Sequence, residues 1–412
     1  MRRTYLILAA SLIPATVLAD AACTQTLHTP PAGLAGSAVN GSNWLDPGTL
    51  RYGLGQAPRF MRGIALTPPA GAPARTPARQ PIDPDRRTAT DPADGAQRSL
   101  RHLLENRIDA DGVLMLQHGQ VLLDYRRSGF DPARPQLLLE ATRPLLVTML
   151  AKASAEGRFA RGKAIPRLIP ELAPSRELAK LSMQRLLDGR TGLQWSDAEF
   201  RQWQREGGWM PAGSVGGVRP WLVRRSAWPR VSGDPGSDMR GPEGALLLWA
   251  TEKAWKKPAP DVLCELLAIS RARNPAFWAT DPAGTPLADG LALSLEDFAA
   301  VGQSLLDART PSGRRTIAPR WFADTLASPG NPAQPTPDAI RALGPDTTWQ
   351  YRFAHPGKGH RAAIIGAYGS SLYVDFDHGT VVAVFASHAQ RHSPLLMASL
   401  RSLWDAAIRT KE

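Results

Sequence analysis

Two groups of strand-like segments, one toward each end of the chain, constrain the fold more than any other feature of the sequence. Residues 112–117 and 121–125 are rich in Val and Leu and flank a tight turn. Residues 371–376 and 380–387 form a second hairpin around an Asp-His-Gly turn. Because helical patterns fill the sequence between them, we expect an α+β fold. Its antiparallel sheet is built from both chain ends and flanked by helices, with a mostly helical inserted domain.

Apolar residues at helical spacing predict the helices around these strands. They cover residues 98–107, 144–157, 176–187, 243–253, 261–271, 294–306 and 394–408. Residues 196–285 are rich in Trp, Gly and Pro and are expected to be helical or irregular. We therefore divide a main domain, residues 99–412, into a sheet part at 99–139 and 286–412 and a helical part at 140–285.

The N-terminus has the features of a targeting segment. Two arginines precede an apolar run at residues 6–18, and Ala19-Asp20-Ala21 has the pattern of a signal cleavage site. We predict a signal peptide at 1–21 and an exported, periplasmic protein with no transmembrane segment. The alternatives are secretion or a lipid anchor at Cys23. Residues 22–98 form a Pro-, Gly- and Ala-rich extension, in which residues 68–92 are typical of a linker.

The cysteine count and the charge exclude some classes of function. Two cysteines, Cys23 and Cys264, are compatible with a disulfide in an oxidising compartment but exclude a multi-cysteine zinc site. The net charge of +12 comes from scattered arginines and favours anionic surroundings such as cell-envelope polymers. No nucleic-acid-binding motif is present, and no motif indicates a cofactor or a metal.

Four segments in a fixed order suggest a family. They are residues 136–160, an Ile-Pro-Glu-Leu at 169–172, the turn LLDGRTGL at 186–193 and the helix at 294–306. In this order they resemble the β-lactamase-related serine hydrolases, in the branch of class C β-lactamases and 6-aminohexanoate-dimer hydrolases. The segment around Trp44 resembles the N-terminal segment that wraps the core in the latter group; a tryptophan that anchors a coil to the surface explains it equally well.

The resemblance implies a β-lactamase/transpeptidase-like fold and a known set of catalytic residues. In the family, a Ser at a helix N-terminus attacks a carbonyl, while a Lys one turn later and a Tyr handle protons. This chain has Glu140 at the Ser position, Arg143 at the Lys position and Gly241 at the Tyr position. Tyr368 lies in the Gly-rich strand start where a His often stands. We therefore expect a degenerate active site in which Glu140 and Arg143 form an ion pair.

Three functions follow from these substitutions. The first is a non-catalytic pseudohydrolase that binds a small molecule, a cell-envelope ligand or a partner in the former cleft. The second is an active hydrolase of esters or amides, such as 6-aminohexanoate oligomers or β-lactam-like substrates, with a relocated nucleophile. Thr142 is the fallback nucleophile, and Ser214 and Ser232 are further candidates. The third is a module that binds peptidoglycan or polyanions through its basic surface. The oligomeric state is left open.

Histidines and tryptophans supply the remaining candidates. His388 and His392 have a spacing that can bind metal on a helix, but a solvated loop is favoured. His355 and His360 are expected on the surface. Tryptophans in the helical part either line a ring-binding cleft or fill the core; they are Trp195, Trp203, Trp209, Trp221 and Trp228.

Overall fold

The strands from the two ends of the chain meet in one antiparallel sheet. The computed structural model describes residues 23–31, 38–69, 75–210, 216–225, 227–231, 241–310, 315–331 and 336–408. Near the middle of the sheet, Val384 of a C-terminal strand pairs with Val113 of an N-terminal strand. The strand order is β10-β11-β12-β13-β14-β5-β6. The strands are β10 (Thr348–Gln350), β11 (Phe353–His355), β12 (Arg361–Ile365), β13 (Ser371–Asp375), β14 (Thr380–Ala386), β5 (Ala110–Gln117) and β6 (Gln120–Arg126). The predicted sheet is confirmed.

Helices cover both faces of this sheet because alternate strand residues point to opposite sides. On one face, Tyr373 stacks on Trp404 with ring centroids 5.0 Å apart. On the other, Phe385 stacks on Phe298 at 5.8 Å. Gly302 lets its helix approach closely, since a Cβ there would lie 2.6 Å from Val381. The covering helices are α2 (Leu100–Leu103), the π-helix η2 (Leu104–Ile108), η7 (Asp338–Leu343) and α11 (Pro394–Ile408) on the first face, with α9 (Leu295–Asp307) on the second.

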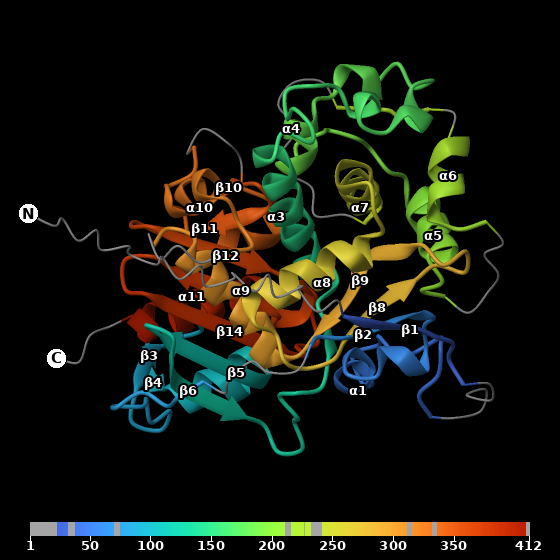
Figure 1. The fold of residues 1–412 in the computed structure, drawn as a ribbon. Coiled ribbons are helices and arrows are strands. Elements are labelled where there is room, and N and C mark those ends of the chain that lie inside the picture. The colour runs from blue at the N-terminus through green and yellow to red at the C-terminus, as the bar shows by residue number, and fades with distance from the viewer. Residues whose placement is uncertain are drawn as a thin grey trace, which may run out of the picture.

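The helical part begins with a helix that is buried on nearly all sides. Helix α3 (Thr142–Ala155) packs against α7 (Pro242–Trp255) and lies between α7 and the seven-stranded sheet (Figure 1). The other elements of this part are η3 (Leu139–Ala141), η4 (Ile165–Arg167), η5 (Pro170–Leu172), η6 (Leu178–Lys180), α4 (Met183–Leu187), α5 (Asp197–Glu206), α6 (Val218–Arg224) and α8 (Ala259–Ser270). Helix α10 (Arg320–Ala327) and η8 (Ala367–Gly369) complete the fold.

One predicted helix is broken. Residues 176–187 form η6 and α4 instead of one helix, because Leu181 is extended and Ser182 caps a new start by accepting from the Arg185 N–H. Ser182 also makes an isolated bridge with Ala164. Tertiary pairing therefore overrides the helical spacing at this point.

A second sheet adds to the predicted architecture. Its order is β1-β2-β8-β9-β7, so strands from the N-terminal extension pair with strands near the end of the helical part. The strands are β1 (Thr24–His28), β2 (Gly63–Thr67), β8 (Ala276–Thr280), β9 (Pro286–Leu293) and β7 (Gln136–Leu137). All residues of β8 and β9 are buried, so these strands lack the alternating pattern that the sequence analysis relied on. The Cys23–Cys264 disulfide joins the start of this sheet to α8.

The extension packs closely on the rest of the chain. Trp44 is buried and stacks on Phe60 and on Trp209 of the helical part, so the core-wrapping alternative describes it better than a surface anchor. Helix α1 (Leu50–Leu54) and η1 (Ala57–Arg59) follow it. Residues 76–82, inside the expected linker, run beside the outer strand β6, where the Ile82 N–H donates to the Leu122 carbonyl. This contact covers a sheet edge that would otherwise be open.

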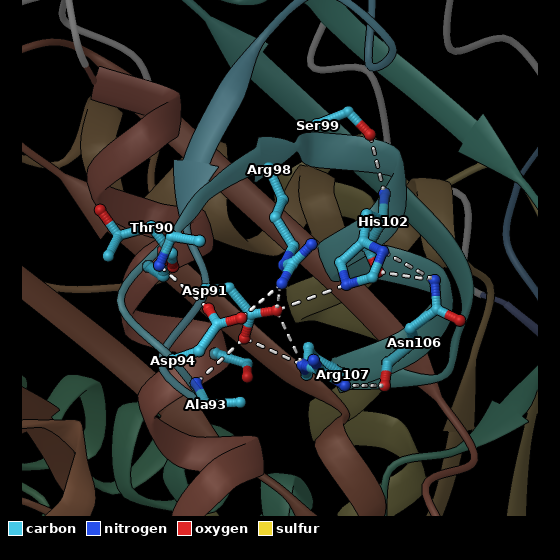
Figure 2. A network of polar contacts seen from close by, with 12 residues as sticks. Thr90, Asp91, Ala93, Asp94, Arg98, Ser99, His102, Asn106 and Arg107 are labelled. Carbon is cyan, nitrogen blue, oxygen red and sulfur yellow. Dashed lines mark hydrogen bonds and ion pairs between the residues drawn. The ribbon is translucent and has the colours of Figure 1, made fainter.

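Near the end of the extension, the buried carboxylate of Asp91 binds three basic side chains (Figure 2). Asp91 lies between β3 (Thr88–Thr90) and β4 (Gln97–Ser99). Arg107 donates from Nε to both carboxylate oxygens at 2.9 and 3.0 Å, and Arg98 and His102 lie at 3.1 and 3.3 Å. The hydrogen bond from Arg107, with backbone donation and the nearby positive charges, outweighs desolvation and lowers the pKa of Asp91 to about 2. The charged form of Asp91 therefore stabilises this hairpin.

Candidate functional site

Most of the positions singled out from the sequence gather where α3 begins. Glu140 lies in η3, Thr142 and Arg143 are the first residues of α3, and Tyr368 lies in η8, which connects the neighbouring strands β12 and β13. The two segments approach closely, because a Cβ on Gly366 would lie 3.1 Å from the Ala141 Cβ. The fold therefore brings together residues that lie more than two hundred positions apart in the sequence.

Glu140 forms an ion pair with Arg391, a residue that the sequence analysis did not single out. The side chain of Glu140 is only 4% exposed, and its Oε1 accepts from both Nε (2.7 Å) and Nη2 of Arg391. Desolvation opposes the charge of Glu140, but the positive charges of Arg391, His392 and Arg143 outweigh it and lower the pKa to about 2. The guanidinium of Arg391 also lies 5.7 Å from the ring centre of Tyr368. Glu140 is therefore an ionised, paired carboxylate at neutral pH.

Arg143 forms a second, fully buried ion pair. Its Nε and Nη2 donate to the two carboxylate oxygens of Asp289 in β9 at 2.7 and 2.6 Å. Burial works against the charge, yet Asp289 and Glu140 raise the pKa of Arg143. This is the bidentate geometry in which a guanidinium binds a carboxylate most strongly.

These partners correct one expectation. The sequence predicts an ion pair between Glu140 and Arg143, but each side chain pairs with a residue from another element. Arg143 contributes only as one of the positive charges that lower the pKa of Glu140. Spacing along one helical turn favours a local pair, whereas the surrounding strands and loops offer better geometry.

Gly241 lies directly before α7 and has no room for a side chain. A Cβ at this position would lie 2.3 Å from the ring of Trp203. Trp203 itself is buried and packs against Phe200. The family resemblance places a tyrosine at position 241. The side chain of Trp203 occupies the space that such a tyrosine would need.

A third buried ion pair lies at the start of α7 and was not predicted. Glu243 accepts from Nη2 of Arg352 at 2.9 Å, and the hydroxyl of Thr191 donates to its other oxygen. Both charged side chains are 3% exposed. One sequence feature could have indicated Glu243 and Asp289. Each is a single acidic residue in an otherwise apolar segment, and a buried acid requires a partner.

Of the three candidate nucleophiles, Thr142 is the one that lies in the described part of the chain. Thr142 is completely buried, and its hydroxyl has no hydrogen-bond partner among the described residues. A substrate carbonyl would have to enter the packed start of α3 to reach it. Ser214 and Ser232 lie outside the described residues.

The histidine expectations are partly wrong. His392 is half-buried in the loop beside Glu140, where desolvation lowers its pKa against the opposing charge of Glu140, so the solvated-loop interpretation describes it only in part. His355 was expected on the surface, yet it is 2% exposed, because β11 places it inside the sheet, and burial lowers its pKa to about 4. His360 is half exposed and pairs with Asp377, as a surface residue does. No cluster of His, Cys, Asp and Glu able to hold a metal ion occurs in the described part of the chain.

The tryptophans of the helical part mostly fill its core. Trp195 contacts Trp221 and Trp228, while Trp209 stacks on Trp44. Four of the five are buried, and Trp221 is partly buried. The core-filling alternative therefore describes them better than a cleft lining.

Comparison with known proteins identifies relatives of this fold. No family model matches the chain. The chain is 26% identical over 304 residues to the 6-aminohexanoate-dimer hydrolase of Paenarthrobacter ureafaciens, which covers 69% of this chain and 75% of the relative. A Bacillus anthracis structure assigned as a 6-aminohexanoate-dimer hydrolase superposes with a TM-score of 0.75 at 18% identity, covering 92% of this chain and 98% of the other. A penicillin-binding protein homologue from Caulobacter crescentus gives a TM-score of 0.52 at 12% identity, covering 74% and 96%.

These comparisons confirm the family resemblance and the fold class that the sequence predicts. The chain has a β-lactamase/transpeptidase-like fold and is similar to β-lactamase-fold serine hydrolases. Among the described residues, no helix has the length and apolar character needed to cross a membrane.

Proposed function

We propose that this relative of the β-lactamase-fold hydrolases has lost acyl-enzyme chemistry and binds a small-molecule or cell-envelope ligand in its former catalytic cleft. The proposal places Glu140 at the position of the nucleophilic Ser and Arg143 at that of the Lys. The observation that carries it is the Glu140–Arg391 ion pair, which holds a buried carboxylate where a free hydroxyl would be required.

The chemistry of these side chains argues against turnover. A carboxylate that accepted an acyl group would form a mixed anhydride, and the charge of Arg391 weakens Glu140 as a nucleophile. Arg143 cannot take a proton from a nucleophile, because its guanidinium stays charged and is held by Asp289. At Gly241, Trp203 leaves no space for a phenol. Each proton-handling role of the family mechanism thus lacks a suitable group.

The buried ion pair of Glu243 and Arg352 supports the same proposal. Glu243 lies two residues after Gly241, and its charge is neutralised by Arg352. Buried charges cost free energy unless they are paired, so such pairs hold the site in one fixed arrangement. A fixed, charged site suits selective binding through shape and hydrogen bonds better than acyl transfer.

Export to the periplasm is part of the proposal. The signal-like N-terminus is supported by the disulfide between Cys23 and Cys264, since disulfides persist in oxidising compartments. A cysteine held in a disulfide cannot carry a thioether-linked lipid, which favours an exported protein without a lipid anchor at Cys23.

An active hydrolase with a relocated nucleophile is the second candidate. The name of the Paenarthrobacter relative favours it, and amide hydrolysis of 6-aminohexanoate oligomers would be the activity. The complete burial of Thr142 opposes that residue as the nucleophile. Ser214 or Ser232 would then have to act with a base from another segment.

Intact-mass spectrometry after incubation with a fluorophosphonate, and separately with a β-lactam, tests the two candidates. We expect no covalent adduct on the folded protein and no release of 6-aminohexanoate from its linear dimer. A stoichiometric adduct on one mapped peptide, abolished by Ser214→Ala or Ser232→Ala, would overturn the proposal and identify the nucleophile. The Thr142→Val variant serves as the control for labelling inside α3.

A further inference from the structure

Two adjoining cavities lie where the N-terminal extension passes the β5–β6 turn, the end of α8 and helix α9. Their volumes are about 980 and 880 Å³, within the usual range for sites that bind small molecules. The residues that line both cavities are Arg75, Gly119, Arg271 and Ala300. The lining belongs to other parts of the described chain than the ion pairs at the start of α3.

Arg75 lies at the junction of the two cavities and is half-buried. Its guanidinium has no hydrogen bond or ion pair with any described residue. Burial lowers the pKa of Arg75, and the positive charges of Arg273 and Arg271 lower it further. The carboxylates of Asp307 and Asp297 act in the opposite direction without reversing this shift. A guanidinium that is withdrawn from water without a partner costs free energy, which an anion entering from the cavity would offset.

Arg271 is a second arginine without a partner. It is exposed, lines both cavities and makes no side-chain hydrogen bond or ion pair with any described residue. It follows the last turn of α8, where a cation is favourable even without a ligand. Arg271 by itself therefore indicates no site. Together with Arg75 it does, because two unpaired guanidiniums on the same walls repel each other until an anion binds both.

The carboxylates of the two cavities already have donors within the protein. Asp297 accepts from the backbone N–H groups of Arg273 and Asn274 at 2.8 and 2.9 Å. The other pairs are Glu296 with Arg273, Glu265 with Lys257, Asp261 with Gln25, Asp124 with Arg126 and Asp307 with Gln303. Asp307 is bound only by a neutral amide, so it is the acid that competes with a ligand for Arg75. Positive charge without a counter-charge therefore remains at Arg75 and Arg271.

We propose that Arg75 and Arg271 bind a phosphate group, with the remainder of the ligand in the cavities on either side. Two guanidiniums match the charge of a phosphate monoester, which is close to two negative charges near neutral pH. Each guanidinium can donate two parallel hydrogen bonds to the phosphate oxygens. A single carboxylate would balance only one of the two arginines. The site is separate from the former catalytic cleft and does not depend on the loss of acyl-enzyme chemistry.

Isothermal titration of the purified, disulfide-bonded protein at constant ionic strength tests this site. The probes are inorganic phosphate and acetate, at about pH 8, where phosphate is a dianion. We expect phosphate to bind with a dissociation constant of about 1 mM or lower. Acetate should bind at least about tenfold more weakly, because it balances only one arginine. Absence of phosphate binding up to about 10 mM overturns the proposal, and so does acetate binding of equal strength.

Variants separate this site from the overall positive charge of the protein. Arg75→Gln and Arg271→Gln should each weaken phosphate binding by at least about tenfold. Arg134→Gln is the matched control, because Arg134 is also exposed without an ion pair among the described residues, yet lines neither cavity. Asp307→Asn removes the competing acid and should tighten binding by about twofold or more.

Three results with these variants would overturn the proposal. The first is wild-type phosphate affinity in Arg75→Gln. The second is equal weakening in Arg134→Gln and Arg75→Gln, which would assign the binding to net charge. The third is weaker phosphate binding in Asp307→Asn, which would show that the acid supports the site instead of competing with the ligand. Each variant replaces a side chain that is not fully buried, so the folded protein is retained for all the titrations.

Discussion

Glu140 and Arg391 lie 251 residues apart in the sequence, and the fold joins them through hydrogen bonds from Nε and Nη2 of Arg391 to one carboxylate oxygen. The first residue precedes α3, and the second belongs to the loop after β14. Their contact connects the start of the helical part to the loop that follows β14 of the seven-stranded sheet.

The first prediction concerns the stability contributed by this pair. Glu140→Gln leaves Arg391 without its counter-charge, and the half-exposed arginine can turn toward water. We expect a loss of about 1–3 kcal/mol in the free energy of unfolding, measured by urea denaturation. Glu171→Gln is the control, because Glu171 and Lys253 form an exposed pair whose loss should cost less than about 1 kcal/mol. Equal losses in both variants would contradict the structural role of Glu140.

The second prediction concerns the buried pair of Arg143 and Asp289. Asp289→Asn removes one charge from a pair that is almost completely inaccessible, so the buried guanidinium loses the carboxylate that binds it through two hydrogen bonds. We expect a destabilisation of about 3–5 kcal/mol in chemical denaturation. The double variant Arg143→Met and Asp289→Leu should recover much of it, because both charges of this buried pair are then removed. A double variant as unstable as the sum of the single variants would refute this explanation.

The third prediction concerns reconstruction of the family motif. Introducing Glu140→Ser with Arg143→Lys restores Ser-x-x-Lys, but Asp289 would raise the pKa of the new lysine and keep it protonated. We expect fluorophosphonate labelling of this variant to remain at background in intact-mass spectra. Adding Asp289→Asn should increase the labelling rate by at least about tenfold, since a neutral lysine can then act as base. Rapid labelling of the double variant would show that Asp289 does not control the proton.

The fourth prediction concerns acid stability. Burial lowers the pKa of His355 to about 4 from an ordinary value of 6.5, so the folded protein holds this side chain neutral. Between these values the unfolded chain binds the extra proton, and stability should fall as the pH drops from about 6.5 toward 4. The slope attributable to His355 should approach about 1.4 kcal/mol per pH unit. In His355→Gln, urea denaturation across this range should give a correspondingly smaller slope; an unchanged slope would assign the effect to other groups.

The fifth prediction concerns the disulfide. Cys23 and Cys264 are separated by 241 residues, and their bond ties β1 to α8. Replacing both with Ser should lower the free energy of unfolding by about 2–5 kcal/mol, because the unfolded chain regains its freedom. Thermal unfolding with and without a reducing agent provides the measurement. In the double variant the reducing agent should have no effect, and a remaining effect would point to another cause.

Local sequence patterns determined much of the architecture. The central hairpins and the long helices follow from side-chain periods of about two and 3.6 residues, which depend only on near neighbours. The break at Ser182 and the strands β8 and β9 escaped prediction, because a tertiary bridge interrupts the first and complete burial removes the alternation from the others.

In the candidate site, too, some features follow from the sequence and others depend on the tertiary structure. The sequence by itself determined which residue types stand at positions 140 and 143, and hence that no Ser-x-x-Lys motif is present there. Only the tertiary structure decided their partners, because Arg391 and Asp289 reach them across 251 and 146 residues. It also decided that His355 is buried and that Arg75 and Arg271 line the same cavities. Ion pairing and burial depend on distances in space, which no spacing along the chain specifies.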